Sequence, residues 1–72
     1  MYTARIIRNN TQEMIEVPGL TLREALRLVN IAWFSCGYQE EALSACIIDE
    51  ASGRVLRAWW EDDITDKSFE EV

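Results

Sequence analysis

The side chains in this sequence that could carry out acid–base or metal chemistry are carboxylates and two thiols, those of Cys36 and Cys46. The chain contains no histidine, so it lacks the usual general base at neutral pH and the usual nitrogen ligand for metals. A Ser–His or Cys–His nucleophile therefore cannot form. The cysteines are also too far apart for the Cys-x-x-Cys pair of a zinc site. We expect two buried free thiols, with a Cys36–Cys46 disulfide as the alternative.

The densest group of carboxylates is the run Glu61, Asp62 and Asp63, followed by Asp66. Such a run could attract a divalent cation, but it has neither the ligand spacing nor the glycine of a calcium-binding loop. None of the three glycines belongs to a phosphate-binding loop, and a chain of 72 residues has little room for a substrate cleft. We therefore expect a protein that is not an enzyme, with no catalytic residue, no metal site and no cofactor.

Two pairs of extended segments predict two β-hairpins. Residues 2–9 and 13–17 alternate between two faces, as strands do, and Pro18-Gly19 is expected to end the second segment. Residues 42–48 and 54–60 predict the second hairpin, because a turn-forming segment with a glycine separates them.

The segment between the hairpins predicts one amphipathic helix. Thr21 and Glu24 have the spacing of a capping box, and Gly37 is expected to end the helix. A continuous apolar stripe with a period of 3.6 residues runs between them: Leu22, Ala25, Leu26, Val29, Ala32, Trp33 and Cys36. The predicted fold is therefore α+β, with the order β-β-α-β-β. We expect an antiparallel sheet of three to four strands, with the helix packed on one face.

The charge of the chain is concentrated at its carboxyl end. Residues 1–60 contain six arginines and seven acidic residues, a net charge of −1, whereas residues 61–72 contain six acidic residues and one lysine, a net charge of −5. We expect residues 1–60 to form a single α+β domain and residues 61–72 to form an acidic C-terminal tail. One turn of helix would fit around residues 65–71.

The sequence also sets expectations about membranes and location. The chain starts with a strand-like segment rather than a charged and then apolar leader, so we expect no signal peptide. No apolar stretch approaches the roughly 18–20 residues that cross a bilayer. The expectation is a cytoplasmic protein without a membrane partner.

The predicted helix carries a second apolar row on the side opposite its stripe. Arg27, Ile31 and Phe34 lie there at i, i+4 and i+7, and Tyr38 would extend the row if the helix runs past Gly37. An apolar row on the face turned away from the sheet is unexpected in a two-layer domain. Arginine and aromatic residues are also those that anchor protein interfaces.

Three occupants could cover this row. A second copy of the chain would make it a homodimer seam, and a different protein would make it a binding site. The third is the chain's own tail, which has apolar residues that need to be buried: Ile64, Phe69 and Val72.

The outer face of the sheet is a second candidate surface. Strand alternation places Arg5, Arg57 and Trp59 there and directs Trp60 to the helix side. Arginines beside an aromatic ring on a sheet can bind single-stranded nucleic acid. The alternative is that the arginine stems simply pack on the tryptophan. The net charge of −6 opposes nucleic-acid binding, because phosphate neutralisation supplies much of that affinity.

The order of the predicted elements, the size and the charge of the chain resemble those of small phage-encoded inhibitors of bacterial defence, the anti-CRISPR type. The resemblance lies in residues 4–7, 21–27 and 43–60, and consists of element order, size and acidic charge without a diagnostic motif. It implies binding to a nuclease or its RNA-guided CRISPR surveillance complex, without catalysis. A weaker similarity to HicB-type antitoxins lies in Val17-Pro-Gly-Leu20 followed by Thr21-Leu-x-Glu-Ala-Leu26. The Gly-Cys and Gly-Asp signals usual between those two pieces are missing.

Three function hypotheses follow from these observations. The first is a non-enzymatic protein-binding module of phage or mobile-element origin, whose acidic residues 61–66 meet a basic patch on a host protein. The second is a small homodimeric structural or regulatory protein. The third is a weak binder of single-stranded nucleic acid.

Overall fold

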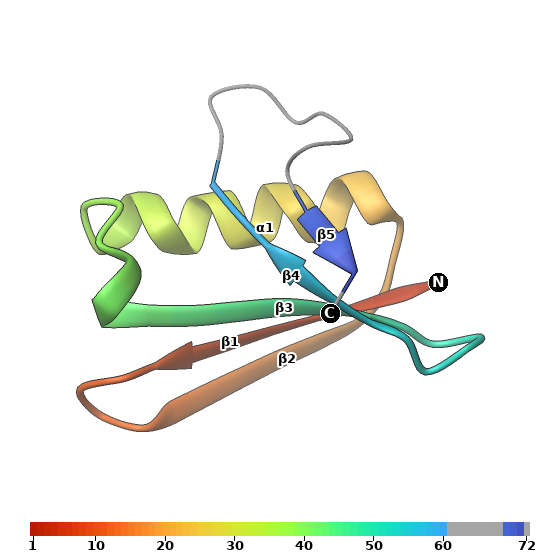
Figure 1. The fold of residues 1–72 in the computed structure, drawn as a ribbon, viewed down its shortest axis with the longest axis horizontal. Coiled ribbons are helices and arrows are strands. Elements are labelled where there is room, and N and C mark those ends of the chain that lie inside the picture. Colours follow the sequence, from red (N-terminus) through yellow and green to blue (C-terminus); the bar gives the residue numbers. More distant parts are fainter. Residues whose placement is uncertain (61–68, 72) are drawn as a thin grey trace.

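One helix lies across one face of a five-stranded antiparallel sheet in a computed structural model, which describes residues 1–60 and 69–71 (Figure 1). The sheet order is β2-β1-β3-β4-β5, so β2 and β5 form its two edges. This confirms the predicted α+β class and adds a strand to the predicted three to four. The elements are β1 (Tyr2–Arg8), β2 (Glu13–Leu20), α1 (Leu22–Ser35), the short 3-10 helix η1 (Glu40–Ala42), β3 (Leu43–Asp49), β4 (Val55–Ala58) and β5 (Phe69–Glu71).

The prediction that Pro18-Gly19 ends the second strand is wrong, because β2 continues to Leu20. Leu20 pairs with Tyr2 and Val17 pairs with Ala4, so the register shifts by one residue between these pairs. Pro18 and Gly19 form a β-bulge there, and Gly19 takes the left-handed φ of +74°. An edge strand tolerates the proline because the ladder does not need its missing N–H.

The start and the inner face of the helix are as predicted. The backbone N–H of Glu24 donates to Thr21 Oγ1 at 3.1 Å, and the backbone N–H of Thr21 donates to Glu24 Oε1 at 2.9 Å. The predicted stripe faces the sheet, and the largest fully buried side chains are Val29 of the helix and Ile47 of β3. The core consists of Ala4, Ile6, Ala25, Leu26, Val29, Trp33, Leu43, Ile47, Leu56 and Ala58.

The carboxyl-terminal residues in the described part of the chain form a strand. We expected one turn of helix around residues 65–71, but Phe69–Glu71 pair with β4 as β5, so the helical prediction is wrong for these residues. Phe69 lies opposite Ala58 and packs half-buried against the core, which stabilises this edge of the sheet. Residues 61–68 and 72 lie outside the described residues. Trp59 and Trp60 follow the end of β4, which is shorter than the predicted segment 54–60.

Glu50 joins the turn after β3 to the N-terminal hairpin. Its Oε2 accepts hydrogen bonds from Thr3 Oγ1 at 3.0 Å and from the backbone N–H of Gly19 at 2.9 Å. These bonds favour the carboxylate form and lower the pKa of Glu50, with the Gly19 bond as the largest cause. The bonds that Thr21 makes lower the pKa of Glu24 in the same way.

We expect the protein to lose stability in acid. A carboxyl group whose pKa is lower in the folded state contributes stability above its unfolded pKa, about 4.3 for glutamate, and this stability disappears as the pH falls through the folded pKa. The urea concentration at the midpoint of unfolding should therefore decrease as the pH is lowered from 6 to 3. The decrease should be smaller in Glu50→Gln than in the wild type. Equal pH dependence of the wild type and Glu50→Gln would contradict this expectation.

No helix in residues 1–60 or 69–71 combines the length and the apolarity needed to cross a membrane.

Candidate interaction surface

The outer side of α1 carries large apolar side chains exposed to solvent. Ile31 is 66% exposed and Phe34 is 69% exposed, and Arg27 is also exposed. The helix therefore has apolar side chains on two sides, as its sequence predicted. The sheet covers only one of these sides. Phe69, one of the tail residues that could have covered this row, packs beside Ala58 at the sheet edge instead.

Tyr38 extends the exposed row, but by a different geometry from the one expected. The helix ends before Gly37 in a Schellman motif, in which the N–H of Gly37 donates to Phe34 O at 3.1 Å and the N–H of Tyr38 donates to Trp33 O at 2.8 Å. Gly37 and Tyr38 both adopt left-handed conformations, with φ of +72° and +58°. For a tyrosine this conformation costs about 1–2 kcal/mol. The end of the helix thus bears a strained aromatic residue at the surface.

The ring of Tyr38 contacts two other aromatic rings, those of Phe34 and Trp60. Its ring meets Phe34 edge-on, with the ring centroids 5.9 Å apart, and meets Trp60 at 4.5 Å. Trp60, which the sequence placed on the helix side of the sheet, is exposed beyond the end of β4. We call Ile31, Phe34, Tyr38 and Trp60 the outer row. Sequence reasoning did not assign Trp60 to it, because nothing local shows where the chain goes after β4.

The acidic residues predicted to act with the outer row, Glu61, Asp62, Asp63 and Asp66, lie outside the described residues. Within the described part of the chain, no group of three or more cysteine, aspartate and glutamate side chains could hold a metal ion.

A row of four charged residues and Cys46 crosses the outer face of the sheet. The strand registers place Glu16, Arg5, Cys46, Arg57 and Glu70 side by side on the five strands. Arg5 Nε donates to Glu16 Oε1 at 2.8 Å, and the guanidinium of Arg57 lies 5.8 Å from the centre of a Trp59 ring. The arginines predicted to bind nucleic acid are therefore engaged within the sheet, and a carboxylate stands at each end of the row.

Both cysteines are free thiols, as the first of the two alternatives predicted, but they are half-buried rather than buried. Burial raises the pKa of Cys46, which keeps this thiol protonated at neutral pH. Cys36 Sγ lies 3.2 Å from the carbonyl oxygen of Trp33 at the end of the helix.

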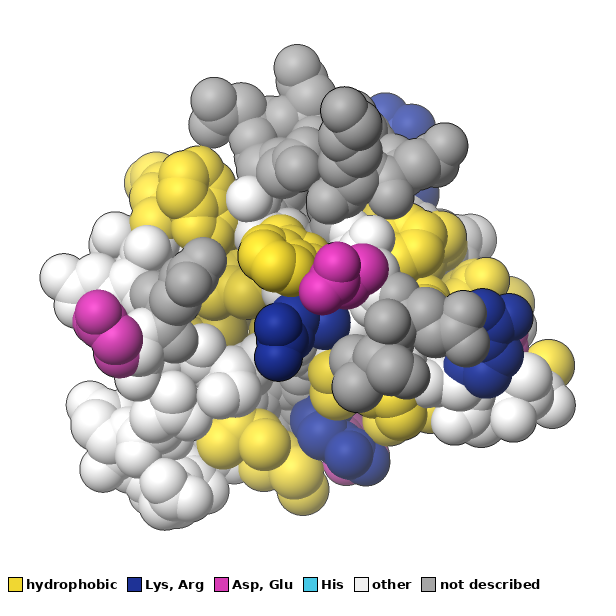
Figure 2. Space-filling model, viewed as in Figure 1, with side chains coloured by type: hydrophobic (Ala, Val, Ile, Leu, Met, Phe, Trp, Pro, Cys, Tyr) yellow, Lys and Arg dark blue, Asp and Glu magenta, His cyan; other side chains and the backbone are white. Residues whose placement is uncertain are grey.

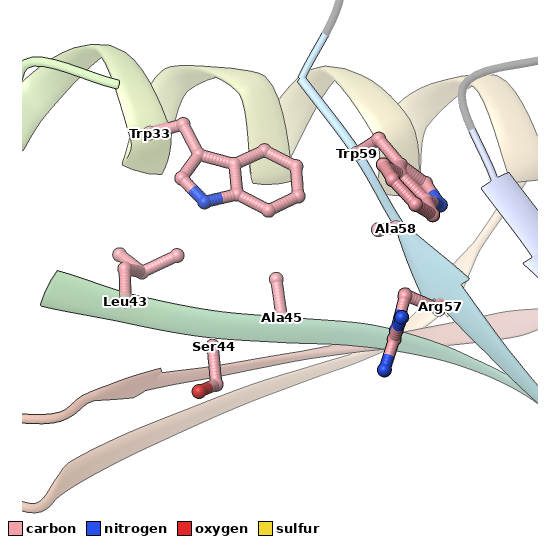
Figure 3. Close-up of a pocket in the computed structure, with 7 residues that line it drawn as sticks. All are labelled: Trp33, Leu43, Ser44, Ala45, Arg57, Ala58 and Trp59. Carbon is pink, nitrogen blue, oxygen red and sulfur yellow. The ribbon is translucent and has the colours of Figure 1, made fainter. Parts of the chain in front are cut away.

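A slot separates β3 from β4 beyond the end of their shared ladder. Residues 46–48 of β3 pair with β4, whereas residues 43–45 pair with β1 alone. The cavity there has a volume of about 440 Å³ and is lined by Trp33, Leu43, Ser44, Ala45, Arg57, Ala58 and Trp59 (Figure 3). Sequence reasoning did not find the slot, because it depends on where the two strands diverge.

One of the lining residues, Trp33, carries an unusual polar group. Its side chain is buried, and its indole Nε1 is a buried polar atom for which residues 1–60 and 69–71 provide no hydrogen-bond partner. An unpaired buried donor costs about 1–3 kcal/mol.

The surface around these features is mixed in character. Figure 2 shows hydrophobic side chains exposed in several separate places, with basic and acidic side chains close together near the centre of the view. No protein-family model, curated protein or solved structure was found that matches the chain. The function must therefore be argued from the outer row, the charged sheet face and the slot.

Proposed function

We propose that the protein is a non-enzymatic binding module that acts by occupying the surface of another protein. The observation that carries this proposal is the exposure of Ile31 and Phe34 on a helix whose other side is already buried. Burying apolar surface is worth roughly 25 cal/mol per Å², and aromatic residues are the usual anchors of interfaces. Tyr38 and Trp60 support the same surface, because their rings contact each other in a tilted arrangement beside Phe34 and so present a preorganised edge.

The charge of the chain indicates the chemistry of the partner. Three acidic residues, Glu61, Asp62 and Asp63, follow Trp60 directly in the sequence, and Asp66 comes soon after. A partner complementary to the outer row and these acids has an apolar groove bordered by basic side chains. Proteins that handle nucleic acids carry such basic surfaces. Together with the anti-CRISPR-type resemblance, this favours a phage or mobile-element inhibitor that blocks an RNA-guided nuclease or surveillance complex.

The same charges disfavour the two other hypotheses. A symmetric homodimer through the outer row would bring together two chains that each have a net charge of −6, and like charges repel. Binding of single-stranded nucleic acid would need free cations, yet Arg5 is paired with Glu16 and Arg57 lies against Trp59. A heterologous protein partner fits the outer row best.

The test is protection of a plasmid in bacteria that carry an RNA-guided nuclease directed against it. The intact protein should restore transformation, and Phe34→Asp should abolish the effect, because losing an interface anchor weakens binding by roughly 30- to 1,000-fold. Met14→Asp is the matched control, since Met14 is an exposed apolar residue on β2, away from the outer row. Circular dichroism should show that both variants are folded.

Three results would contradict the proposal. If Phe34→Asp protects as well as the intact protein, the outer row is not the binding site. If the intact protein restores transformation against none of a panel of RNA-guided nucleases, the inhibitor hypothesis is wrong. Light scattering at about 10 μM, a concentration at which most stable dimers remain associated, should give the mass of one chain. A two-chain mass that Phe34→Asp halves would replace the proposal with the homodimer.

A further inference from the structure

Three aromatic rings meet where the outer side of α1 ends, and we call Phe34, Tyr38 and Trp60 the aromatic corner. The planes of the Phe34 and Tyr38 rings are nearly perpendicular, at 76°, and the Trp60 ring is tilted by 40° against that of Tyr38. All three side chains reach solvent, with Tyr38 40% exposed and Trp60 36% exposed. The face of an aromatic ring carries a negative electrostatic potential. Two nearly perpendicular rings therefore offer this potential to two sides of one ligand.

The backbone at the end of the helix holds the corner in place. The N–H of Tyr38 donates to Trp33 O at 2.8 Å, and this closing turn gives Tyr38 its φ of +58°. A left-handed conformation is unfavourable for a tyrosine, and strain of this kind clusters at sites that bind ligands. The ring of Tyr38 is thus kept at the surface, between Phe34 and Trp60, by the way in which the helix ends.

The surroundings of the corner are electronegative. The carboxyl end of a helix carries a partial charge of roughly minus half an elementary charge, and none of the residues in the last turn of α1 is basic. Two acidic residues come close to the corner in the sequence. Glu41, which is exposed, stands three residues after Tyr38, and Glu61 follows Trp60 directly. The charge of this region therefore complements a cation.

We propose that the aromatic corner binds the guanidinium group of an arginine side chain on the partner protein. A cation within about 6 Å of a ring centroid is attracted by the ring, and arginine makes such contacts more often than lysine. The guanidinium is also planar, stacks on aromatic faces and loses its water more readily than an ammonium group. This inference rests on the proposed function, because it names the group with which a basic partner surface occupies the outer row.

Nuclear magnetic resonance of the ¹⁵N-labelled full chain tests the corner without the partner. The probe is the peptide acetyl-Leu-Arg-Leu-amide, whose leucines supply the apolar contacts of a groove. The matched peptide has citrulline, a neutral isostere, in place of the arginine. The indole N–H signal of Trp60, assigned by its loss in Trp60→Phe, should move saturably with the arginine peptide. The citrulline peptide should bind about fivefold more weakly, because it lacks the attraction between a cation and the rings.

Two variants with unchanged net charge separate the rings of the corner from the charge of the whole chain. Phe34→Leu keeps an apolar side chain that favours a helix but removes one ring, so it should reduce the preference for arginine to about twofold or less. Trp59→Leu is the matched control. Trp59 is 38% exposed, much like Trp60, but its ring lies against Arg57 on the outer face of the sheet. Its loss should leave the preference for arginine at about fivefold.

Any of three results overturns the inference. Equal affinity for the two peptides would make the corner an apolar contact only, and the protein could still be an inhibitor that docks through the outer row. A Trp60 signal that does not move up to about 10 mM arginine peptide, a concentration at which even a millimolar site is mostly filled, would exclude an arginine site. A Trp60 signal that moves when the protein alone is concentrated would show that a second copy fills the corner. A preference for arginine in a protein that protects no plasmid would support the corner and contradict the inhibitor hypothesis alone.

Discussion

Val29→Asp is expected to unfold the protein at neutral pH. Val29 is fully buried between the helix and the sheet, and an aspartate there would be a carboxylate without a charged partner. Removing such a charge from water costs several kcal/mol. A domain of this length has a total stability on the order of 4–11 kcal/mol, so the substitution consumes most or all of it. Loss of the far-ultraviolet circular dichroism signal and of a cooperative urea transition would measure the effect.

Ile31→Asp is the matched control, two residues further along the same helix. Ile31 lies in the outer row, so its carboxylate would remain in water, and surface substitutions usually change stability by no more than about 0.5 kcal/mol. The pair therefore tests whether the helix has one side in the core and one in solvent. Equal destabilisation by both substitutions would show that the outer row is part of the folded core.

Ile47→Ala is expected to have the second largest effect on stability. Ile47 is fully buried on β3, between Ala4 of β1 and Leu56 of β4. Truncating a buried isoleucine to alanine removes apolar contacts and leaves a cavity, which together cost about 2–5 kcal/mol. The free energy of unfolding from urea titration should fall by that amount, with little change in the slope of the transition.

Val55→Ala provides the comparison for Ile47→Ala. Val55 lies on the neighbouring strand β4, but it is exposed at the outer face of the sheet. Its truncation should cost less than about 1 kcal/mol, because little apolar surface returns to water. A cost for Val55→Ala equal to that of Ile47→Ala would mean that the outer face of the sheet is covered, and the assignment of the two faces would be wrong.

The parts of the fold that sequence reasoning predicted are those controlled by neighbouring residues. The spacing of Thr21 and Glu24 fixed the start of the helix, and Gly37 marked its end, because capping motifs act within one turn. The strands that it missed or shortened depend on distant partners. Phe69–Glu71 became a strand because the edge of β4 was available, which no pattern in three residues can show.

The same distinction holds for the candidate sites. A helical wheel alone identified Ile31 and Phe34 as the exposed side of the helix. The wheel could not show that Tyr38 reaches the row through a left-handed turn, or that the ring of Trp60, beyond the end of β4, contacts that of Tyr38. The slot was beyond sequence reasoning for a similar reason, since it lies where β3 and β4 diverge.

The bulge at Pro18 and Gly19 also affects how this protein meets copies of itself. An exposed edge strand offers backbone donors and acceptors that can recruit a strand from another molecule. In β2 the proline removes one donor, the bulge bends the line of pairing, and Glu13 and Glu16 add charge along the edge. We expect the β2 edge to resist pairing with strands of other molecules, and so to resist growth of the sheet into fibrils. Contacts with other proteins should then form through side-chain surfaces such as the outer row.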